Sequence, residues 1–371
     1  MKIGIQAEVR RNERRVASSP ETVKKLIKLG HEVLIQFGAG SHANFSDELF
    51  SKIGAKIVSD DDIFDCDIIL TIRTPSKENL KKLKSSSVLI GMLDPYDEEN
   101  VKLIAKTGVT AFALEAIPRI TRAQSMDVLS SQANIAGYKA VLLAANYYQK
   151  FLPMLMTAAG TVKAARVLIM GVGVAGLQAI ATAKRLGAII EASDVRPPVK
   201  EQVESLGAKF IDVPYLTDEE AEIASGSGGY ARPMPPEWMK RQAELVHERA
   251  KISDIIITTA LIPGKKAPIL IAENTVKSMR PGSVIVDMAI EQGGNCSLSV
   301  LGENINKYGI HIIGEENLPS LCASDSSALY SRNILDFLML LLNKDGSLEI
   351  NKNDEIINSS MICSEYNIIL K

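Results

Sequence analysis

The sequence predicts an α/β protein built from two doubly wound parallel sheets, with a cleft between the two domains. Short apolar runs alternate with amphipathic segments of helix length along nearly all of the 371 residues. A long helical stretch, expected over residues 125–151, interrupts this alternation once, and the alternation begins again at residue 165. The length is enough for two to three domains of about 150 residues each.

The first third of the chain has the repeated strand–helix–strand order that is typical of a parallel sheet with right-handed crossovers. Helices are expected over residues 20–30, where Gly30 ends the helix, and over residues 95–108. Strands are expected over residues 2–6, 31–38, the end of 61–73, 86–93 and 109–117.

A second doubly wound unit follows the long helix. Its strands are expected over residues 165–171, 187–194, 208–213, 253–260, 282–289 and 309–314. One more helix is expected over residues 327–343, and small strands are expected in 345–354 and 359–371. These last strands have no sheet of their own, so we expect them to complete the first domain. The predicted domains are therefore residues 1–135 completed by 316–371, and residues 136–315.

Composition excludes several classes of protein. The formal net charge is −2, which gives no electrostatic footprint for nucleic acid. Four widely scattered cysteines and no clustered histidines argue against a disulfide framework and a metal site, and favour a reducing compartment. The N-terminus has no apolar segment of the kind found in secretory signals. The longest apolar stretch, residues 334–342, falls far short of the roughly 20 residues needed to cross a bilayer.

A glycine-rich turn is the strongest functional motif. Gly171, Gly173 and Gly176 have GxGxxG spacing and lie directly between an apolar strand and an amphipathic helix, as in a Rossmann-like dinucleotide-binding unit. Asp194 ends the next strand, where a carboxylate binds ribose hydroxyls and repels a 2′-phosphate. This arrangement favours NAD(H) over NADP(H). Arg196 is a complication, because an arginine there can accommodate a 2′-phosphate.

A general acid or base for a keto-acid substrate is missing. Each of the four histidines (His31, His42, His247 and His311) lies where a solvated or packing role is expected. Instead, residues 118–132 form a polar segment at the start of the long helix. One interpretation is a helix N-cap by Ser125 or Asp127. The other is a set of groups that orients a nicotinamide for hydride transfer without donating a proton.

Five motifs give the chain a family resemblance. NERRVASSP, RAQSMDVLSSQANIAGY, GVGVAGLQAIATAKRLGA, TTALIPGKKAP and DMAIEQGGN resemble the alanine dehydrogenase and nicotinamide nucleotide transhydrogenase superfamily over essentially the whole chain. Within that superfamily the sequence is most similar to the NAD(H)-binding subunits of proton-translocating transhydrogenases. The resemblance implies direct hydride transfer between NAD(H) on this chain and NADP(H) on a partner subunit.

The two branches of the superfamily differ in their expected chemistry. Alanine dehydrogenases are expected to carry a lysine and a histidine that bind and protonate the substrate, and here those positions hold Arg73 and Asp94. Arg15, which matches the carboxylate-binding arginine of those enzymes, is kept. The absence of the lysine and the histidine fits transhydrogenation, in which hydride passes between two nicotinamide rings and no substrate proton is handled.

The resemblance also implies site residues. Arg119, Gln124 and Asp127 are expected to be catalytic, and no metal ligand is expected. Tyr230 matches a mobile-loop tyrosine that closes over the nucleotide. The residues expected to bind the cofactor are Arg119, Ile120, Thr121, Arg122, Gln124, Ser130, Gly171, Gly173, Val174, Ala175, Gly176, Asp194, Val195, Arg196, Gly229, Tyr230, Gln242 and Leu261.

The expected partners are separate membrane-spanning and NADP(H)-binding subunits and a second copy of the chain. The chain itself would be cytoplasmic, held at the cytoplasmic face of the inner membrane by these partners and not inserted in lipid. Two alternatives remain open. The first is an alanine-type amino-acid dehydrogenase, which would turn over NADH, pyruvate and ammonia without any partner subunit. The second is a non-enzymatic NAD(H) sensor, which would bind nucleotide without transferring hydride.

Overall fold

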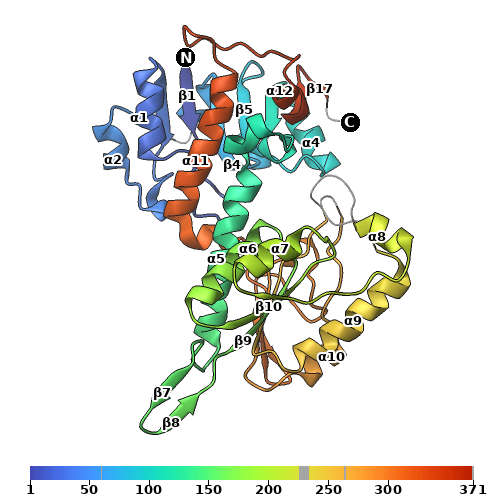
Figure 1. Ribbon diagram of the computed structural model, residues 1–371. Helices are drawn as coiled ribbons and strands as arrows, with labels where there is room; N and C mark the ends of the chain where they lie inside the picture. The colour runs from blue at the N-terminus through green and yellow to red at the C-terminus, as the bar shows by residue number, and fades with distance from the viewer. Residues whose placement is uncertain (60, 225–233, 263–264, 370–371) are drawn as a thin grey trace. The chain divides into compact units, whose positions relative to one another are not determined.

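The computed structural model divides into two compact units (Figure 1). The first unit combines Met1–Gln132 with Pro319–Lys371, and the second unit is Ala133–Leu318. The structure describes residues 1–59, 61–224, 234–262 and 265–369. The first unit is therefore discontinuous in sequence, and each unit has its own sheet.

The first unit contains an eight-stranded sheet in the order β17-β16-β6-β5-β4-β1-β2-β3. Its strands are β1 (Lys2–Ile5), β2 (Glu32–Gln36), β3 (Lys56–Val58), β4 (Ile68–Arg73), β5 (Val88–Met92), β6 (Thr110–Ala113), β16 (Met361–Ser364) and β17 (Asn367–Ile368). Strands β1 to β6 pair in parallel, whereas β16 runs antiparallel to β6 and β17 antiparallel to β16. The C-terminal segment thus extends the sheet, as predicted from the tail.

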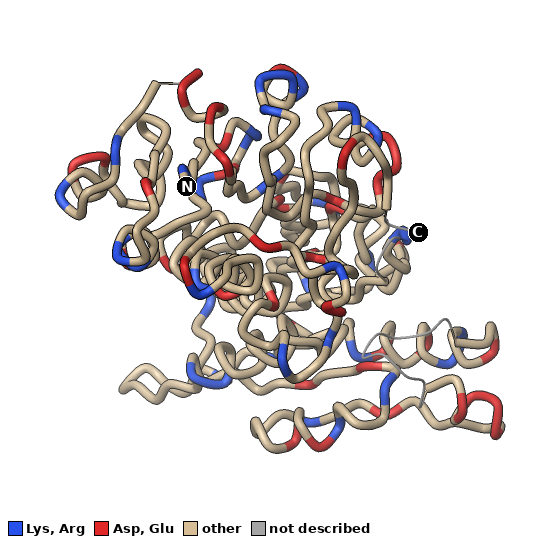
Figure 2. The backbone as a smooth tube through the Cα atoms, turned by 90° about the horizontal axis from the view of Figure 1, so that it is seen from above, with Lys and Arg blue, Asp and Glu red and all other residues tan. Residues whose placement is uncertain are grey.

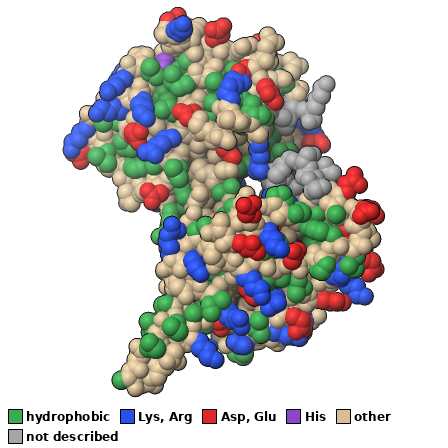
Figure 3. Space-filling model, in the orientation of Figure 1, with side chains coloured by type: hydrophobic (Ala, Val, Ile, Leu, Met, Phe, Trp, Pro, Cys, Tyr) green, Lys and Arg blue, Asp and Glu red, His purple; other side chains and the backbone are tan. Residues whose placement is uncertain are grey.

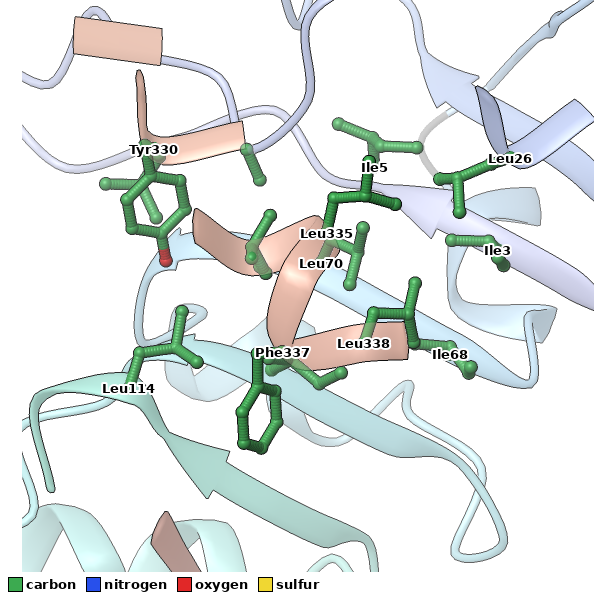
Figure 4. Close-up of a cluster of buried hydrophobic side chains, with 14 of the residues drawn as sticks. Ile3, Ile5, Leu26, Ile68, Leu70, Leu114, Tyr330, Leu335, Phe337 and Leu338 are labelled. Carbon is green, nitrogen blue, oxygen red and sulfur yellow. The ribbon is translucent and has the colours of Figure 1, made fainter. Parts of the chain in front are cut away.

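Helices cover both faces of this sheet. They are α1 (Pro20–Lys28), α2 (Asp47–Lys52), α3 (Lys77–Leu80), α4 (Glu98–Ala105), α11 (Ala323–Leu340), α12 (Glu355–Ser360) and the start of α5 (Val128–Tyr147). Because successive strand residues point to opposite faces, Ile68 and Leu70 pack with α11 while Ile69 packs with α4. Figure 4 shows Leu335, Phe337 and Leu338 of α11 lying over the strands.

The second unit has a seven-stranded sheet in the order β11-β10-β9-β12-β13-β15-β14. Its strands are β9 (Arg166–Met170), β10 (Ile189–Ser193), β11 (Lys209–Phe210), β12 (Ile255–Thr258), β13 (Val284–Asp287), β14 (Asn304–Lys307) and β15 (Ile310–Ile313). All pair in parallel except β14, which is antiparallel to β15. The chain runs outward from β9 to β11 and then returns to β12 on the other side of β9. The topological switch point is therefore between β9 and β12.

The helices of the second unit lie on both faces of its sheet. They are the rest of α5, α6 (Val174–Arg185), α7 (Val199–Ser205), α8 (Asp218–Ala224), α9 (Pro236–Ala250) and α10 (Glu273–Ser278). Val246 and Ala250 of α9 and Val276 of α10 share one core with alternate strand residues such as Leu168 and Ile256. A separate two-stranded hairpin, β7 (Leu155–Thr157) with β8 (Gly160–Val162), joins neither larger sheet.

Several predicted elements differ from the structure. The helix predicted from residue 125 is a 3₁₀ turn over Thr121–Met126 followed by α5, because the Asp127 carboxylate caps the helix start. The strand predicted over residues 208–213 is shorter in the structure, where β11 covers only Lys209–Phe210. The strand predicted in residues 345–354 is reduced to one antiparallel bridge between Leu348 and Leu342. Asp345 accepts hydrogen bonds from the Ser347 N–H and hydroxyl and closes a turn just before it. Strands β3, β7, β8 and β14 were not predicted.

No helix within the described ranges is long and apolar enough to cross a membrane. Basic and acidic residues alternate along the backbone of both units and do not form one continuous basic stretch (Figure 2). This distribution agrees with the formal net charge of −2.

The contact of α11 with the sheet gives a stability prediction. Phe337 is fully buried and meets the ring of Phe112 edge-on, with centroids 5.4 Å apart. Phe337→Ala is expected to lower the free energy of unfolding by about 3–5 kcal/mol, because it leaves a cavity between helix and sheet. Denaturant unfolding of the whole chain measures this loss. Met339→Ala, at an exposed site of the same helix, should change it by about 0.5 kcal/mol or less. Equal losses in both variants would contradict the assigned core.

Candidate functional site

The glycine turn connects β9 to α6 at the switch point of the second sheet. Gly171 has φ +94°, and a Cβ atom there would lie 2.7 Å from the Thr259 hydroxyl. A Cβ atom on Gly176 would lie 2.1 Å from the Gly171 carbonyl oxygen, so only glycine lets the helix approach the strand. A Cβ atom on Gly173 would meet no atom within 4 Å, so open space lies beside the turn. Gly173 supplies no side-chain cap to the first turn of α6.

Asp194 directly follows β10, beside this turn. Its Oδ2 accepts the Val172 N–H at 2.7 Å and Arg196 Nη2 at 2.8 Å. Its Oδ1 accepts both the backbone N–H and Nε of Arg196 at 2.9 Å. The carboxylate therefore links the glycine turn to the strand end. Arg196, which the sequence left as a possible partner of a 2′-phosphate, is ion-paired with Asp194, the residue predicted to bind the ribose.

A third segment, residues 259–261 after β12, completes the switch point. The Thr259 hydroxyl donates to the Gly171 carbonyl oxygen at 2.8 Å. Asn295 binds Ala260 twice, accepting its N–H at 3.1 Å and donating to its carbonyl oxygen at 2.9 Å. These bonds fix the backbone just before Leu261, whose side chain is 37% exposed.

The buried carboxylate of Asp287 holds Asn295 in turn. It lies at the end of β13 and is 1% exposed. It accepts hydrogen bonds from the Thr258 hydroxyl and from the N–H groups of Ala289, Asn295 and Cys296, at 2.9–3.1 Å. Sequence reasoning missed Asp287 and Asn295, although both lie within the family motif DMAIEQGGN. The signal that could have found them is an acidic residue at the end of an apolar strand.

These three segments fit a dinucleotide. The open space at Gly173 and the start of α6 suit a pyrophosphate, because the helix N-terminus carries N–H donors and a positive dipole. A carboxylate one strand away suits a ribose. Exposed apolar side chains at Val174 and Leu261 suit the face of a base. Val195 is partly exposed and Gln242 is buried in α9. Gly229 and Tyr230, also predicted to bind nucleotide, lie outside the described residues.

The polar segment lies in the first unit. Arg119, Thr121 and Gln124 are exposed on and beside its 3₁₀ turn. Asp127 accepts the Ser130 N–H at 2.8 Å and the Ser130 hydroxyl at 2.6 Å, which is the hydrogen bonding of a helix N-cap. The capping interpretation that the sequence left open is therefore present in the structure, and it places Asp127 and Ser130 in one contact.

Two side chains tie this segment to the C-terminal segment of the first unit. Arg122 donates two hydrogen bonds to Asp354, at 2.7 and 3.0 Å, so its guanidinium has a carboxylate partner. Asn333 of α11 donates to the Ser125 carbonyl oxygen and accepts from the Ser131 hydroxyl, both at 2.7 Å. The 3₁₀ turn is thereby held at both ends while Gln124 stays exposed.

Arg15 is buried, and each of its three guanidinium nitrogens donates a hydrogen bond to another side chain. Glu13 binds its guanidinium at two points, Nε–Oε1 at 2.8 Å and Nη2–Oε2 at 2.6 Å, and Gln132 Oε1 accepts from Nη1 at 2.7 Å. Burial alone would raise the pKa of Glu13, but the hydrogen bonds and charge of Arg15 lower it to about 2. The arginine that the resemblance matched to a carboxylate-binding residue thus already holds a carboxylate of its own chain.

Two further carboxylates lie at the same edge of the first sheet. Glu8 accepts the Ile72 N–H at 2.6 Å, and Glu115 accepts the Asp94 N–H at 2.7 Å. Desolvation by the surrounding protein raises the pKa of each to about 7, despite these hydrogen bonds. Arg73 Nε lies 3.7 Å from Glu13, and the Asp94 side chain is exposed. Among the described residues no group of three or more potential metal ligands occurs.

The fold and the glycine turn define a class of protein, the two-unit α/β proteins that carry a dinucleotide-type turn on one of their sheets. The chain belongs to the alanine dehydrogenase/PNT family, matching its N-terminal domain over residues 4–136 and its C-terminal domain over residues 140–371.

Individual relatives distinguish the branches of that family. An NAD(P) transhydrogenase subunit alpha chain of Rhodospirillum rubrum is 47% identical over 100% of this chain and 98% of its own length. The crystal structure of transhydrogenase from Sinorhizobium meliloti is 42% identical, with a TM-score of 0.87 over 100% of this chain and 99% of that one. Alanine dehydrogenase 2 of Staphylococcus aureus is 29% identical over 93% of this chain and 88% of its own length. The chain is thus more similar to transhydrogenase subunits than to this alanine dehydrogenase.

The raised pKa of Glu8 gives a pH prediction. The ordinary pKa of a glutamate is 4.5, and burial raises the pKa of Glu8 to about 7 in the folded chain. Between these two pH values Glu8 therefore keeps a proton in the folded chain that it releases in the unfolded chain. The contribution of protonated Glu8 to the free energy of unfolding is therefore complete below about pH 4.5, and it is lost as the pH rises through 7. Glu8→Gln keeps an oxygen acceptor but cannot titrate. We expect this variant to lose less stability than the parent chain between pH 5 and 8, measured by thermal unfolding.

Glu48→Gln is the matched control, because Glu48 is an exposed carboxylate on α2 of the same unit. It should leave the pH profile of the parent chain unchanged. If Glu8→Gln follows the same profile as the parent, Glu8 does not hold the proton.

Proposed function

We propose that the chain is the NAD(H)-binding alpha subunit of a proton-translocating NAD(P) transhydrogenase and is active only with partner subunits. The observation that carries this proposal is the glycine turn with Asp194 at a switch point, in a chain that aligns over its full length with NAD(P) transhydrogenase subunits alpha. When bound, NAD(H) exchanges hydride with NADP(H) held by a partner subunit.

The second unit supplies the proposed nucleotide contacts. The turn residues Val174, Ala175 and Gly176 would receive the pyrophosphate. Asp194 and Val195 would receive the adenosine ribose, at a position bordered by the Arg196 side chain that pairs with Asp194. Leu261 and Gln242 would flank the adenosine. Two supports for this assignment are the open space beside Gly173 and the network of Asp287 and Asn295 that holds residues 259–261 still.

In the first unit, Arg119 and Gln124 are proposed to orient the nicotinamide end. Both side chains are exposed, and Gln124 lies on the 3₁₀ turn itself. Asp127 would act with them by fixing the start of α5 through its bonds to Ser130. Arg122 is ion-paired with Asp354, so any contact between Arg122 and nucleotide would compete with that pair. None of these side chains needs to transfer a proton in the proposed role.

The rival proposal, an alanine-type dehydrogenase, is weakened by the surroundings of Arg15. A keto-acid substrate needs a free guanidinium for its carboxylate, and here Glu13 and Gln132 bind all three nitrogens of Arg15. A bidentate Arg–Glu pair buried at both ends is costly to open, since it would leave a buried charge without a partner.

The proposed partners are membrane-spanning and NADP(H)-binding subunits and a second copy of this chain. We place the assembly at the cytoplasmic face of the inner membrane, with this chain attached through its partners. The β7–β8 hairpin supports a homodimer, because isolated two-stranded hairpins are marginally stable. Met156 on β7 and Met154 just before it are exposed. Figure 3 shows hydrophobic side chains on the surface of the projecting hairpin.

The deciding experiment mixes the purified chain with NADH, an oxidised NAD analogue and a separately expressed NADP(H)-binding transhydrogenase domain. A parallel reaction contains NADH, pyruvate and ammonium with this chain alone. Fast hydride exchange in the first reaction only is expected. Alanine formation in the second would favour the dehydrogenase. Nucleotide binding without exchange in either would favour a sensor.

Gln124→Asn tests the nicotinamide end of the site. It shortens the side chain by one methylene group and keeps the amide, so NADH binding should remain nearly intact. Hydride exchange with the partner-bound nucleotide should slow by about tenfold or more, which corresponds to about 1.4 kcal/mol of activation free energy. Gln149→Asn, the same change at an exposed site after the far end of α5, should leave the rate unchanged. An unchanged rate in Gln124→Asn would remove Gln124 from the site.

Met156→Glu tests the hairpin as a dimer contact. Met156 is 78% exposed on β7, and a carboxylate buried between two copies would lack a partner. Light scattering should show a shift from dimer toward monomer at micromolar protein. Leu301→Glu, at an apolar residue of the same unit that is 51% exposed, should leave the dimer intact. A dimer that survives Met156→Glu would exclude the hairpin as the contact.

A further inference from the structure

The carboxylate of Asp194 has no acceptor position left for a ribose. A carboxylate offers about four lone-pair positions on its two oxygens. The N–H of Val172 and the backbone N–H of Arg196 take two of them, at 2.7 and 2.9 Å. Nε and Nη2 of the Arg196 side chain take the other two, at 2.9 and 2.8 Å.

A dinucleotide ribose therefore competes with Arg196 for the same oxygens. Two of the four donors are backbone groups that belong to the turn and to the strand end, so they cannot leave without moving the chain. The guanidinium is a side-chain group, so it can leave these oxygens without moving the backbone, and the Arg196 side chain is 22% exposed. The pair between Arg196 and Asp194 is thus the contact that binding has to open.

We propose that the Arg196 guanidinium, which bonds both carboxylate oxygens of Asp194 in this structure, is displaced from them when the ribose of NAD(H) binds. This inference rests on the proposed function and deepens it. Arg196 would then act against nucleotide binding as a competitor, and its pairing with Asp194 would determine how strongly the site discriminates between NADH and NADPH.

Tyr215 allows this exchange to occur without a shift of the backbone. Its hydroxyl donates to the Val195 carbonyl oxygen at 2.9 Å, between the two members of the pair. Its ring stacks on Trp238 with an interplanar angle of 12° and a centroid distance of 6.4 Å, and Trp238 is 1% exposed. Tyr215 is therefore a positioning residue that keeps the strand end in place while the guanidinium moves.

The inference predicts opposite effects on the two nucleotides when the guanidinium is removed. Without Arg196, the oxygens of Asp194 are free for ribose hydroxyls, so NADH should bind more tightly. The unpaired carboxylate should also repel a 2′-phosphate more strongly, so NADPH should bind more weakly. Because removing a partly exposed ion pair has a modest effect, each change should be about threefold, and the NADH/NADPH preference should widen about tenfold.

The experiment compares Arg196→Met with the parent chain by calorimetric titration of NADH and of NADPH into the full chain. Methionine has a similar length and no donor for Asp194. Arg185→Met is the matched control, because Arg185 is an exposed arginine at the C-terminal end of α6 and its removal changes the net charge equally. Weaker binding of both nucleotides in Arg196→Met, beyond the control, would overturn the inference and leave NAD(H) binding itself intact. Failure of the parent chain to bind NADH would overturn the inference together with the proposed function.

Tyr215→Phe tests the positioning role separately. It keeps the ring on Trp238, the only tryptophan of the chain, and removes only the hydroxyl. Trp238 emission of the free variant should match that of the parent, while the dissociation constant for NADH rises about threefold or more. Tyr308→Phe, which removes a hydroxyl bonded to Glu273 near the start of β15, should bind NADH as the parent does. Unchanged NADH affinity in Tyr215→Phe would exclude the positioning role.

Discussion

In both units, side-chain carboxylates accept hydrogen bonds from backbone N–H groups at the carboxyl ends of the parallel strands. Buried N–H groups at such ends have no partner in the sheet, and leaving them without an acceptor is costly. Four carboxylates serve this need: Glu8 after β1, Glu115 after β6, Asp194 after β10 and Asp287 at the end of β13. Because each joins a strand end to a neighbouring segment, the loops at these edges have defined conformations.

The same carboxylates must be neutralised once they are buried, and the chain does this in different ways. Asp194 pairs with Arg196. Glu13, a further buried carboxylate of the first unit, pairs in the same way with Arg15. Glu8 and Glu115 instead have pKa values raised to about 7 by desolvation. Asp287 is surrounded by backbone donors. The type of partner that a carboxylate has matters for function, because a ligand can displace a guanidinium but cannot displace a set of backbone N–H donors.

This division separates a rigid frame from adjustable contacts. Around the glycine turn, Asp287, Asn295 and Thr259 bind backbone, and they hold the turn in a shape that leaves space beside Gly173. In the first unit, Asn333 and Asp127 hold the 3₁₀ turn and leave Gln124 exposed. In the proposed role, in which no substrate proton is handled, such orientation matters more than an acid or base.

The sequence by itself determined the α/β class, most of the parallel strands and the glycine turn, because these follow from apolar periodicity and from residues close together in the chain. It also indicated Asp194, which follows the turn by one strand. Only the tertiary structure decided that Arg15 is occupied by Glu13 and by Gln132, 117 residues away, that α11 covers the first sheet, and that Asp287 holds the loop after β12. It also decided that Arg196 turns back onto Asp194, although the two are neighbours in sequence. Pattern and spacing define elements and turns, but the partner of a buried charge depends on which distant groups the packed fold brings within hydrogen-bonding distance.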